Sequence, residues 1–202
     1  MLTQNPTLKR TLIVWAPPLL LILVSAILQA ADWVVLLRYD RHLIEAGQIW
    51  RLLTGHLVHL GWSHWLLNSL GLLIIWALLE PEQQNWRSLL LLLACCLLTG
   101  IGLFLFSPQV GWYVGLSGAL HGLLVAGMLR LWPRQPVFAT VVLLVLLAKL
   151  VWEQVYGPMP HSVRAAGGPV VVDAHTWGAL AGVLIELPRL IYIRLRDLGT
   201  GD

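Results

Sequence analysis

Two polar residues lie at the start of two long apolar segments that are far apart in the sequence. Ser117 belongs to the glycine-flanked stretch at residues 115–118, and His175 precedes Gly178 by three positions. Polar groups inside a bilayer are costly and usually mark function. A serine becomes a nucleophile when a base takes its proton and nearby donors stabilise the developing negative charge. We therefore interpret Ser117 as a nucleophile and His175 as its base.

The surroundings of both residues favour this pairing. Ser117 follows a turn-prone stretch, so it should lie near a helix N-terminus, where free N–H groups favour negative charge. Gly118 and Gly122 form one G-x-x-x-G pattern, and Gly178 and Gly182 form another. Such patterns let two helix backbones approach closely. Each residue alone also fits a structural role, as a hydroxyl or imidazole bonded within the bundle, but the paired glycine patterns favour contact between them.

A second polar pair, His64 and Asn68, lies on another apolar segment. Their i, i+4 spacing puts them on one helix face. Both side chains can donate hydrogen bonds to an oxyanion. A polar pair that joins neighbouring helices is the alternative. Beside a serine and a histidine at the same membrane face, the oxyanion-hole role is the better interpretation.

The composition requires a membrane environment for the elements that carry these residues. Hydrophobic residues make up 58% of the 202-residue chain, charged residues only 11%, and the mean hydropathy is +0.77. A soluble domain needs more charge to cover its surface. We predict an all-α, polytopic bundle of six transmembrane helices, forming a single membrane domain over residues 1–202. The predicted spans lie near 12–31, 63–80, 87–107, 117–132, 136–155 and 170–193.

The first span is predicted to be retained, because its apolar part is long and no clean cleavage site follows it. Basic residues flank the spans instead of forming a phosphate-binding stripe, so no nucleic-acid partner is expected. The positive-inside rule favours cytoplasmic termini. On this topology the inner side carries Lys9, Arg10, Arg87, Arg130, Arg134, Arg189, Arg194 and Arg196. Ser117, His175 and the start of the second span then share the outer face.

Other polar residues near these spans receive weaker interpretations. Asp173 lies two positions before His175 and is expected to be a helix cap or a loop carboxylate, with a third triad position as the alternative. Lys149 and Glu153 are spaced i, i+4 and are expected to pair with each other. Glu186 lies deep in the last span without an evident role.

Three histidines at positions 56, 59 and 64 raise the question of a metal site. No carboxylate or cysteine completes a ligand set beside them. We therefore expect neither a metal ion nor a cofactor.

Taken together, the motifs resemble those of the rhomboid intramembrane serine proteases. The matching features are Trp50-Arg51, His59, His64-x-x-x-Asn68, Gly115-x-Ser117-Gly118 and Ala174-His175-x-x-Gly178-x-x-x-Gly182. The resemblance implies a Ser117–His175 dyad in a water-filled cavity, with the Ser117 amide, His64 and Asn68 as the oxyanion hole. It also implies a bacterial inner (cytoplasmic) membrane protein with both termini cytoplasmic and a site that opens to the periplasm.

One departure from the family pattern concerns His121. Many rhomboids carry an aromatic residue four positions after the serine, packed against the catalytic histidine, and here that residue is His121. It shares a helix face with Ser117, so it is expected to support the site, as an alternative base or a second proton shuttle. Gly115, Gly118 and Gly178 are expected to support the same site.

The Gly-Leu-Ser-Gly-Ala-Leu-His-Gly form of residues 115–122, in a compact chain, is similar to the rhombosortase branch. That resemblance implies a role in protein sorting. The substrates would be membrane-anchored proteins with a C-terminal sorting tail, made of a glycine-rich motif, one apolar span and a basic end.

Two functions of other classes are alternatives. A non-catalytic rhomboid-like factor would bind and escort membrane proteins, but it would not need both Ser117 and His175. A small membrane transporter would typically show inverted repeats or broken helices in matching positions, and the sequence shows neither pattern.

Overall fold

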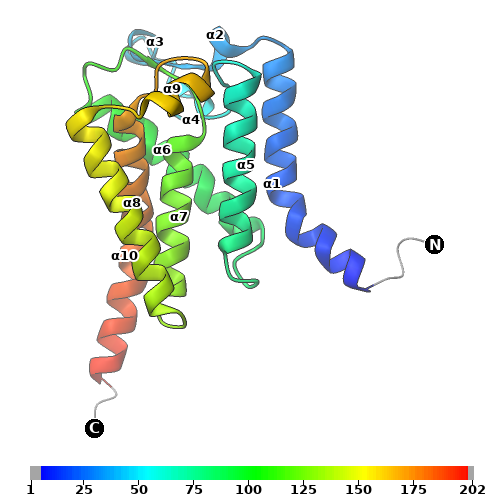
Figure 1. The fold of residues 1–202 in the computed structure, drawn as a ribbon, viewed down its shortest axis with the longest axis vertical. Coiled ribbons are helices and arrows are strands. Elements are labelled where there is room, and N and C mark those ends of the chain that lie inside the picture. Colours follow the sequence, from blue (N-terminus) through cyan, green and yellow to red (C-terminus); the bar gives the residue numbers. More distant parts are fainter. Residues whose placement is uncertain (1–5, 200–202) are drawn as a thin grey trace.

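Six helices of 15 residues or more form a bundle in the computed structural model, which describes residues 6–199. Each overlaps one predicted apolar segment. They are α1 (Pro6–Ala30), α5 (Trp62–Leu78), α6 (Trp86–Phe106), α7 (Ser117–Leu131), α8 (Pro136–Tyr156) and α10 (Val172–Gly199) (Figure 1).

Three stretches within the described residues are long and apolar enough to cross a membrane: Thr11–Ala30, Trp86–Phe106 and Pro136–Tyr156. Helices α5 and α7 are apolar but shorter, with 17 and 15 residues. The helices fit a membrane protein, and the count of six spans stays a prediction. Of the predicted inner-side residues, the side chains of Lys9, Arg10 and Arg194 lie outside the described part.

Short elements gather at one end of the bundle, whereas α1 begins and α10 ends at the other (Figure 1). These elements are α2 (Val34–Leu37), α3 (Arg41–Glu45), α4 (Arg51–Thr54) and α9 (Pro160–Ala166). The same region contains the antiparallel strand pair β1 (Tyr39–Asp40) and β2 (Trp112–Tyr113), with Tyr39 opposite Tyr113. The strand pair ties the segment before α5 to the segment before α7.

Two arginines hold the segment between α1 and α5 in place. Arg41 donates to the carbonyl oxygens of Leu103 and Ser107, at 2.8 and 2.9 Å, at the C-terminal end of α6. Each of these carbonyls also accepts a backbone hydrogen bond, from the N–H of Ser107 and of Val110 respectively, so the guanidinium adds a second donor at the end of the helix. Arg51 is buried and donates to the Arg38 carbonyl oxygen at 2.8 Å and to Gln48 Oε1 at 2.7 Å. Arg51 of the Trp50-Arg51 motif thus has a structural role.

Local chemistry accounts for several helix boundaries and for one bend. Pro136 and Pro160 occupy the first turns of α8 and α9, where a missing N–H costs least. Gly167 ends α9 in the left-handed conformation, with φ of 74°. Pro17 and Pro18 lie inside α1, which bends away from the bundle toward its N-terminal end (Figure 1).

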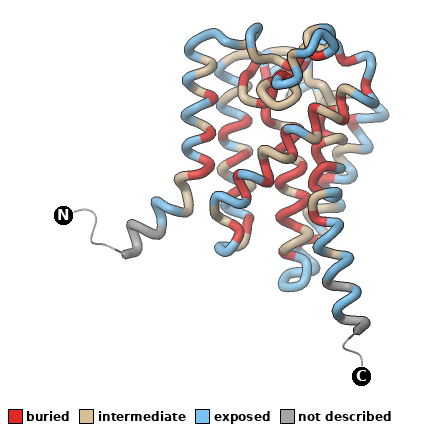
Figure 2. The backbone as a smooth tube through the Cα atoms, turned by 180° about the vertical axis from the view of Figure 1, so that it is seen from behind, coloured by how far each residue is buried: buried red, intermediate tan, exposed pale blue. Residues whose placement is uncertain are grey.

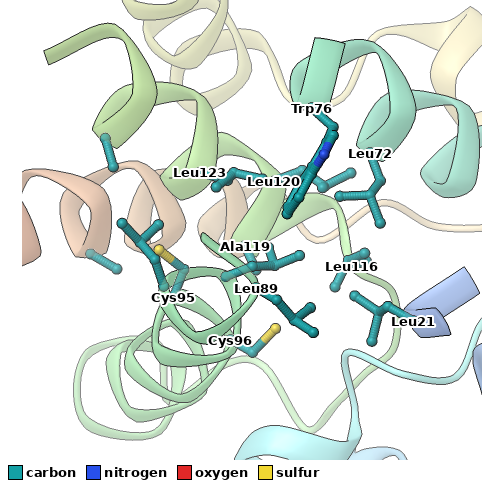
Figure 3. Packing of buried hydrophobic residues seen from close by; sticks show 14 of the residues in the cluster. Leu21, Leu72, Trp76, Leu89, Cys95, Cys96, Leu116, Ala119, Leu120 and Leu123 are labelled. Carbon is teal, nitrogen blue, oxygen red and sulfur yellow. The ribbon is translucent and has the colours of Figure 1, made fainter. Parts of the chain in front are cut away.

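The largest apolar core lies where α5, α6 and α7 meet. Figure 3 shows Leu72 and Trp76 of α5 close to Leu120 and Leu123 of α7, with the buried thiol of Cys95 nearby on α6. The buried residues run through the centre of the molecule, and the outer faces are exposed (Figure 2). Those outer faces are largely apolar, as a lipid environment requires.

Glu186, which has no evident role in the sequence, forms a buried ion pair near the end of the bundle opposite the short elements. Its Oε1 accepts a hydrogen bond from Arg130 Nε at 2.7 Å, and Arg189 Nη1 lies 3.7 Å from its Oε2. The pair joins α7 to α10. Removing Arg130 would leave the buried Glu186 carboxylate with only the more distant guanidinium of Arg189, which would destabilise the folded protein.

Candidate active site

Glycines allow α7 and α10 to pack backbone against backbone. A Cβ atom at Gly118 would lie 2.6 Å from the Ala174 carbonyl oxygen, and one at Gly122 would lie 2.5 Å from that of Gly178. A Cβ at Gly178 or Gly182 would overlap the carbonyl oxygens of Gly118 and Gly122. No other residue fits at such separations. The two glycine patterns thus face each other, in the most extensive helix–helix contact of the described residues.

This packing brings the starts of the two helices together. Ser117 is the first residue of α7, and His175 lies in the first turn of α10. Ser117 Oγ lies 3.0 Å from His175 Nε2, so the contact expected from the sequence is present. The first N–H groups of α7 have no acceptor within the helix. A negative charge that develops beside Ser117 would therefore meet both free donors and the positive end of the helix dipole.

The other ring nitrogen of His175 contacts a carboxylate from α8. His175 Nδ1 lies 2.8 Å from Glu153 Oε2, and Lys149 Nζ lies 2.7 Å from the same oxygen. The Lys149–Glu153 pair expected from the sequence is therefore present, but it also includes the histidine. Asp173, which lies two residues before His175 in sequence, accepts a hydrogen bond from Gln109 Nε2 at 2.6 Å instead.

A signal for Glu153 exists in the sequence but is weak. Ala139, Leu146 and Glu153 are the buried residues of α8, and their spacing of seven puts them on one stripe. An acidic residue in such a stripe indicates a buried partner, although it does not identify that partner.

His121 lies directly against the catalytic candidates. Its ring stacks on that of His175, with centroids 4.4 Å apart and an interplanar angle of 16°. Its Nδ1 is 2.7 Å from the Ser117 carbonyl oxygen, and its Nε2 is 3.0 Å from Lys149 Nζ. Both ring nitrogens of His121 therefore have partners, and Nδ1 contacts the Ser117 carbonyl oxygen and not its hydroxyl. This geometry suits a supporting residue better than an alternative base.

His64 and Asn68 line the same cavity as Ser117 and His175, which has a volume of about 660 Å³. The Leu60 N–H donates to His64 Nδ1 at 3.4 Å, so Nε2 of that ring carries the proton and is a donor. Asn68 Nδ2 donates to the His64 carbonyl oxygen at 3.0 Å. A primary amide has two N–H bonds, so one remains for a ligand. The cavity therefore offers two side-chain donors together with the start of α7.

Gly115 makes room for the His64 ring. A Cβ atom at this position would lie 2.6 Å from His64 Cε1, and its φ of 116° is one that other residues rarely adopt. The Gly115 N–H donates to the Gly55 carbonyl oxygen at 3.0 Å, and the Tyr113 hydroxyl donates to the Gly115 carbonyl oxygen. The loop that leads into Ser117 is thus held on both sides.

A rhomboid domain model matches residues 46–191 of the chain, a range that contains the cavity and all its polar residues. The chain belongs to the rhomboid family. The family resemblance of the sequence is therefore confirmed, whereas the assignment to the rhombosortase branch stays a prediction.

Two curated relatives of this rhomboid come from Bacillus subtilis (strain 168). "Rhomboid protease GluP" is 37% identical over 87 residues, which are 43% of this chain and 17% of the relative. "Putative rhomboid protease YdcA" is 35% identical over 80 residues, which are 40% of each chain. The similarity thus spans less than half of either relative.

Proposed function

We propose that this rhomboid is an intramembrane serine endopeptidase. The observation that carries the proposal is the 3.0 Å contact between Ser117 Oγ and His175 Nε2, inside a cavity that also holds donors for an oxyanion. His175 Nε2 takes the serine proton while Oγ attacks a peptide carbonyl carbon. The Ser117 amide, His64 and Asn68 stabilise the tetrahedral oxyanion. Collapse to an acyl-enzyme expels the amine, which takes the proton from His175, and water then hydrolyses the ester.

The substrate class proposed is a membrane-anchored protein whose chain unwinds beside Ser117. Besides its polar residues, the cavity is lined by apolar side chains, among them Leu67 and Ile75 from α5 and Val141 and Val145 from α8. An extended segment of an apolar anchor could bury its side chains against this wall and present its backbone to Ser117. Cleavage would occur near the periplasmic face of a bacterial inner membrane.

For the natural substrates, we propose proteins with a glycine-rich C-terminal sorting tail, whose anchor is removed by the cut. This step rests on the form of residues 115–122, which resembles the rhombosortase motif. Glycine residues near the scissile bond would suit this mechanism. They have no side chain, so the unwound substrate backbone can approach Ser117 closely.

The test uses the full chain in liposomes with a fluorophosphonate probe and two single-span substrates, one with a glycine-rich tail and one without. Wild-type protein should label at Ser117 and release the tail, with the new C-terminus identified by mass spectrometry. S117A should lose labelling and cleavage while its thermal unfolding stays unchanged. S63A, which alters a nearby exposed serine outside the cavity, is the control and should behave as wild type.

Three outcomes separate the alternatives. Substrate binding without labelling would favour an escort factor over a protease. No labelling and no binding would favour a transporter. Equal cleavage of both substrates would keep the protease and overturn only the sorting-tail specificity.

A further inference from the structure

Helix α8 exposes most of its apolar surface and buries only three of its residues. Those three, Ala139, Leu146 and Glu153, form one stripe that faces the bundle. Glu153 continues the stripe of two apolar residues with a carboxylate, and its side chain is 1% exposed. A buried charge in a membrane-spanning helix is costly unless it is paired and hydrogen-bonded. Its partners therefore indicate why it lies there.

The Glu153 carboxylate contacts the ammonium group of Lys149 and the imidazole ring of His175. Its Oε2 lies 2.7 Å from Lys149 Nζ and 2.8 Å from His175 Nδ1. The lysine is one turn earlier on the same helix, so it can neutralise the carboxylate within α8 itself. The contact with His175 instead crosses to α10, and it reaches the ring nitrogen that Ser117 does not use.

The shortest contacts around the two stacked imidazoles are consistent with one proton arrangement. Lys149 Nζ also lies 3.3 Å from His175 Nδ1, farther than the Glu153 carboxylate oxygen at 2.8 Å. Glu153 accepts from His175 Nδ1–H, which leaves Nε2 free to accept from the Ser117 hydroxyl. Lys149 donates to His121 Nε2, whose Nδ1–H donates to the Ser117 carbonyl oxygen. Each ring then has one donor and one acceptor nitrogen, as a neutral imidazole must. The carboxylate and the ammonium thus set both tautomers.

We propose that Glu153 is a positioning residue for His175, so that the site works as a Ser117–His175–Glu153 triad and not as a dyad. This inference rests on the proposed function and assigns a role within it. Glu153 holds the imidazole with Nε2 toward the serine. When His175 takes the serine proton, the ring becomes a cation, and the adjacent carboxylate stabilises it. Lys149 neutralises Glu153 before that step, so the resting pair carries no net charge.

A neighbouring hydrogen bond provides a control for the alternative that Glu153 serves only to link α8 to α10. The next residue, Gln154, donates to Thr176 Oγ1 at 2.9 Å, and Thr176 follows His175. This neighbouring bond joins the same two helices one residue along, without contact to either ring. Q154L removes a hydrogen bond between the same two helices and leaves the Glu153–His175 bond in place.

The test compares E153Q, E153D and Q154L in the full chain in liposomes. E153Q should lower kcat and the fluorophosphonate labelling rate by at least about 10-fold, because an amide cannot stabilise the imidazolium. KM should change by less than about 2-fold, since the Glu153 side chain is only 1% exposed and its carboxylate is bonded to Lys149 and His175. E153D should recover part of the rate. Q154L should stay within about 2-fold of wild type.

A second readout does not depend on turnover. In ¹⁵N-histidine NMR, wild-type protein should show a His175 Nδ1–H proton shifted far downfield by its bond to the carboxylate. E153Q should lose that shift and Q154L should keep it. Equal rate losses in E153Q and Q154L, or an unchanged His175 signal in E153Q, would overturn the proposal.

The two proposals fail in different ways. If wild-type protein shows no Ser117-dependent labelling or cleavage, the proposed function is wrong. If wild-type protein is active and E153Q matches it, only the triad is wrong.

Discussion

Histidines in this protein differ in role because their burial and partners differ. His175 has a hydroxyl on one nitrogen and a carboxylate on the other, and His64 has its donor nitrogen set by the Leu60 N–H. His56 and His59 lie before α5 and are buried against aromatic and imidazole rings. Burial lowers the pKa of His56 to about 4 and that of His59 to about 3. These two rings are therefore neutral parts of the frame around the cavity.

This neutrality predicts a loss of stability in mild acid. Below pH 6.5 the unfolded chain binds protons on these histidines, whereas the folded protein does not until the pH nears 4. The free energy of unfolding should thus fall as the pH drops through that window, by about 1.4 kcal/mol per pH unit for each histidine. H56Q should reduce the slope by one histidine's share, as measured by denaturant unfolding in micelles between pH 4.5 and 7.

The control for this prediction is S63A, which changes an exposed side chain that carries no titratable group. Its slope should match that of wild type. An H56Q slope that also matches wild type would contradict the burial argument, whatever the absolute stability of the variant.

At the scale of elements, the contact between α7 and α10 decides the site. The two glycine patterns let the helices meet at the level of their backbones, and this approach brings Ser117 to His175. Larger residues would separate the helices by the width of at least one methyl group. A hydrogen bond weakens steeply over such an increase.

G178A should therefore impair both stability and chemistry. Its Cβ would overlap the Gly118 carbonyl oxygen, which belongs to backbone and cannot rotate away. We expect a loss of at least about 1–3 kcal/mol in unfolding free energy. We also expect slower fluorophosphonate labelling than in wild type.

G61A is the matched control, because a Cβ there meets nothing within 4 Å and its φ of 173° is open to any residue. Thermal unfolding and labelling of G61A should equal those of wild type. Normal labelling by G178A would show that the close helix contact is not needed for the Ser117–His175 pair.

At the scale of the whole molecule, the two ends of the bundle have different chemistry. The short helices, the strand pair and the starts of α7 and α10 lie at one end (Figure 1). The loops α5–α6 and α7–α8 lie at the other, where Arg134 bonds Glu80 at 2.8 Å. The cavity with Ser117 therefore belongs to the end that the positive-inside rule puts outside.

Cysteine accessibility tests this orientation in intact bacterial cells. H42C, at an exposed position of α3, should react with a membrane-impermeant maleimide, and E82C, at an exposed position of the α5–α6 loop, should react only after the cells are permeabilised. The native Cys95 and Cys96 are buried and should stay unlabelled in the parent protein. Reaction of E82C and not H42C in intact cells would reverse the orientation.

The sequence by itself determined the features that depend on local composition and spacing. Apolar runs and their proline and glycine breaks predict where the helices lie, and the glycine spacing around Ser117 and His175 predicts that their helices touch. These are properties of single segments or of two matching patterns. They are sufficient to indicate both the family and the candidate pair, because the glycine patterns themselves specify which faces of the two helices can approach closely.

Only the tertiary structure decided which carboxylate serves His175. Asp173 is two residues from His175 in sequence but accepts a hydrogen bond from Gln109. Glu153 is 22 residues from His175, and its carboxylate contacts His175 Nδ1. The choice depends on the rotation of α8 and on its distance from α10, and neither is encoded in a local pattern. For the same reason, the pairing of Glu186 with Arg130 could be identified only in the packed bundle.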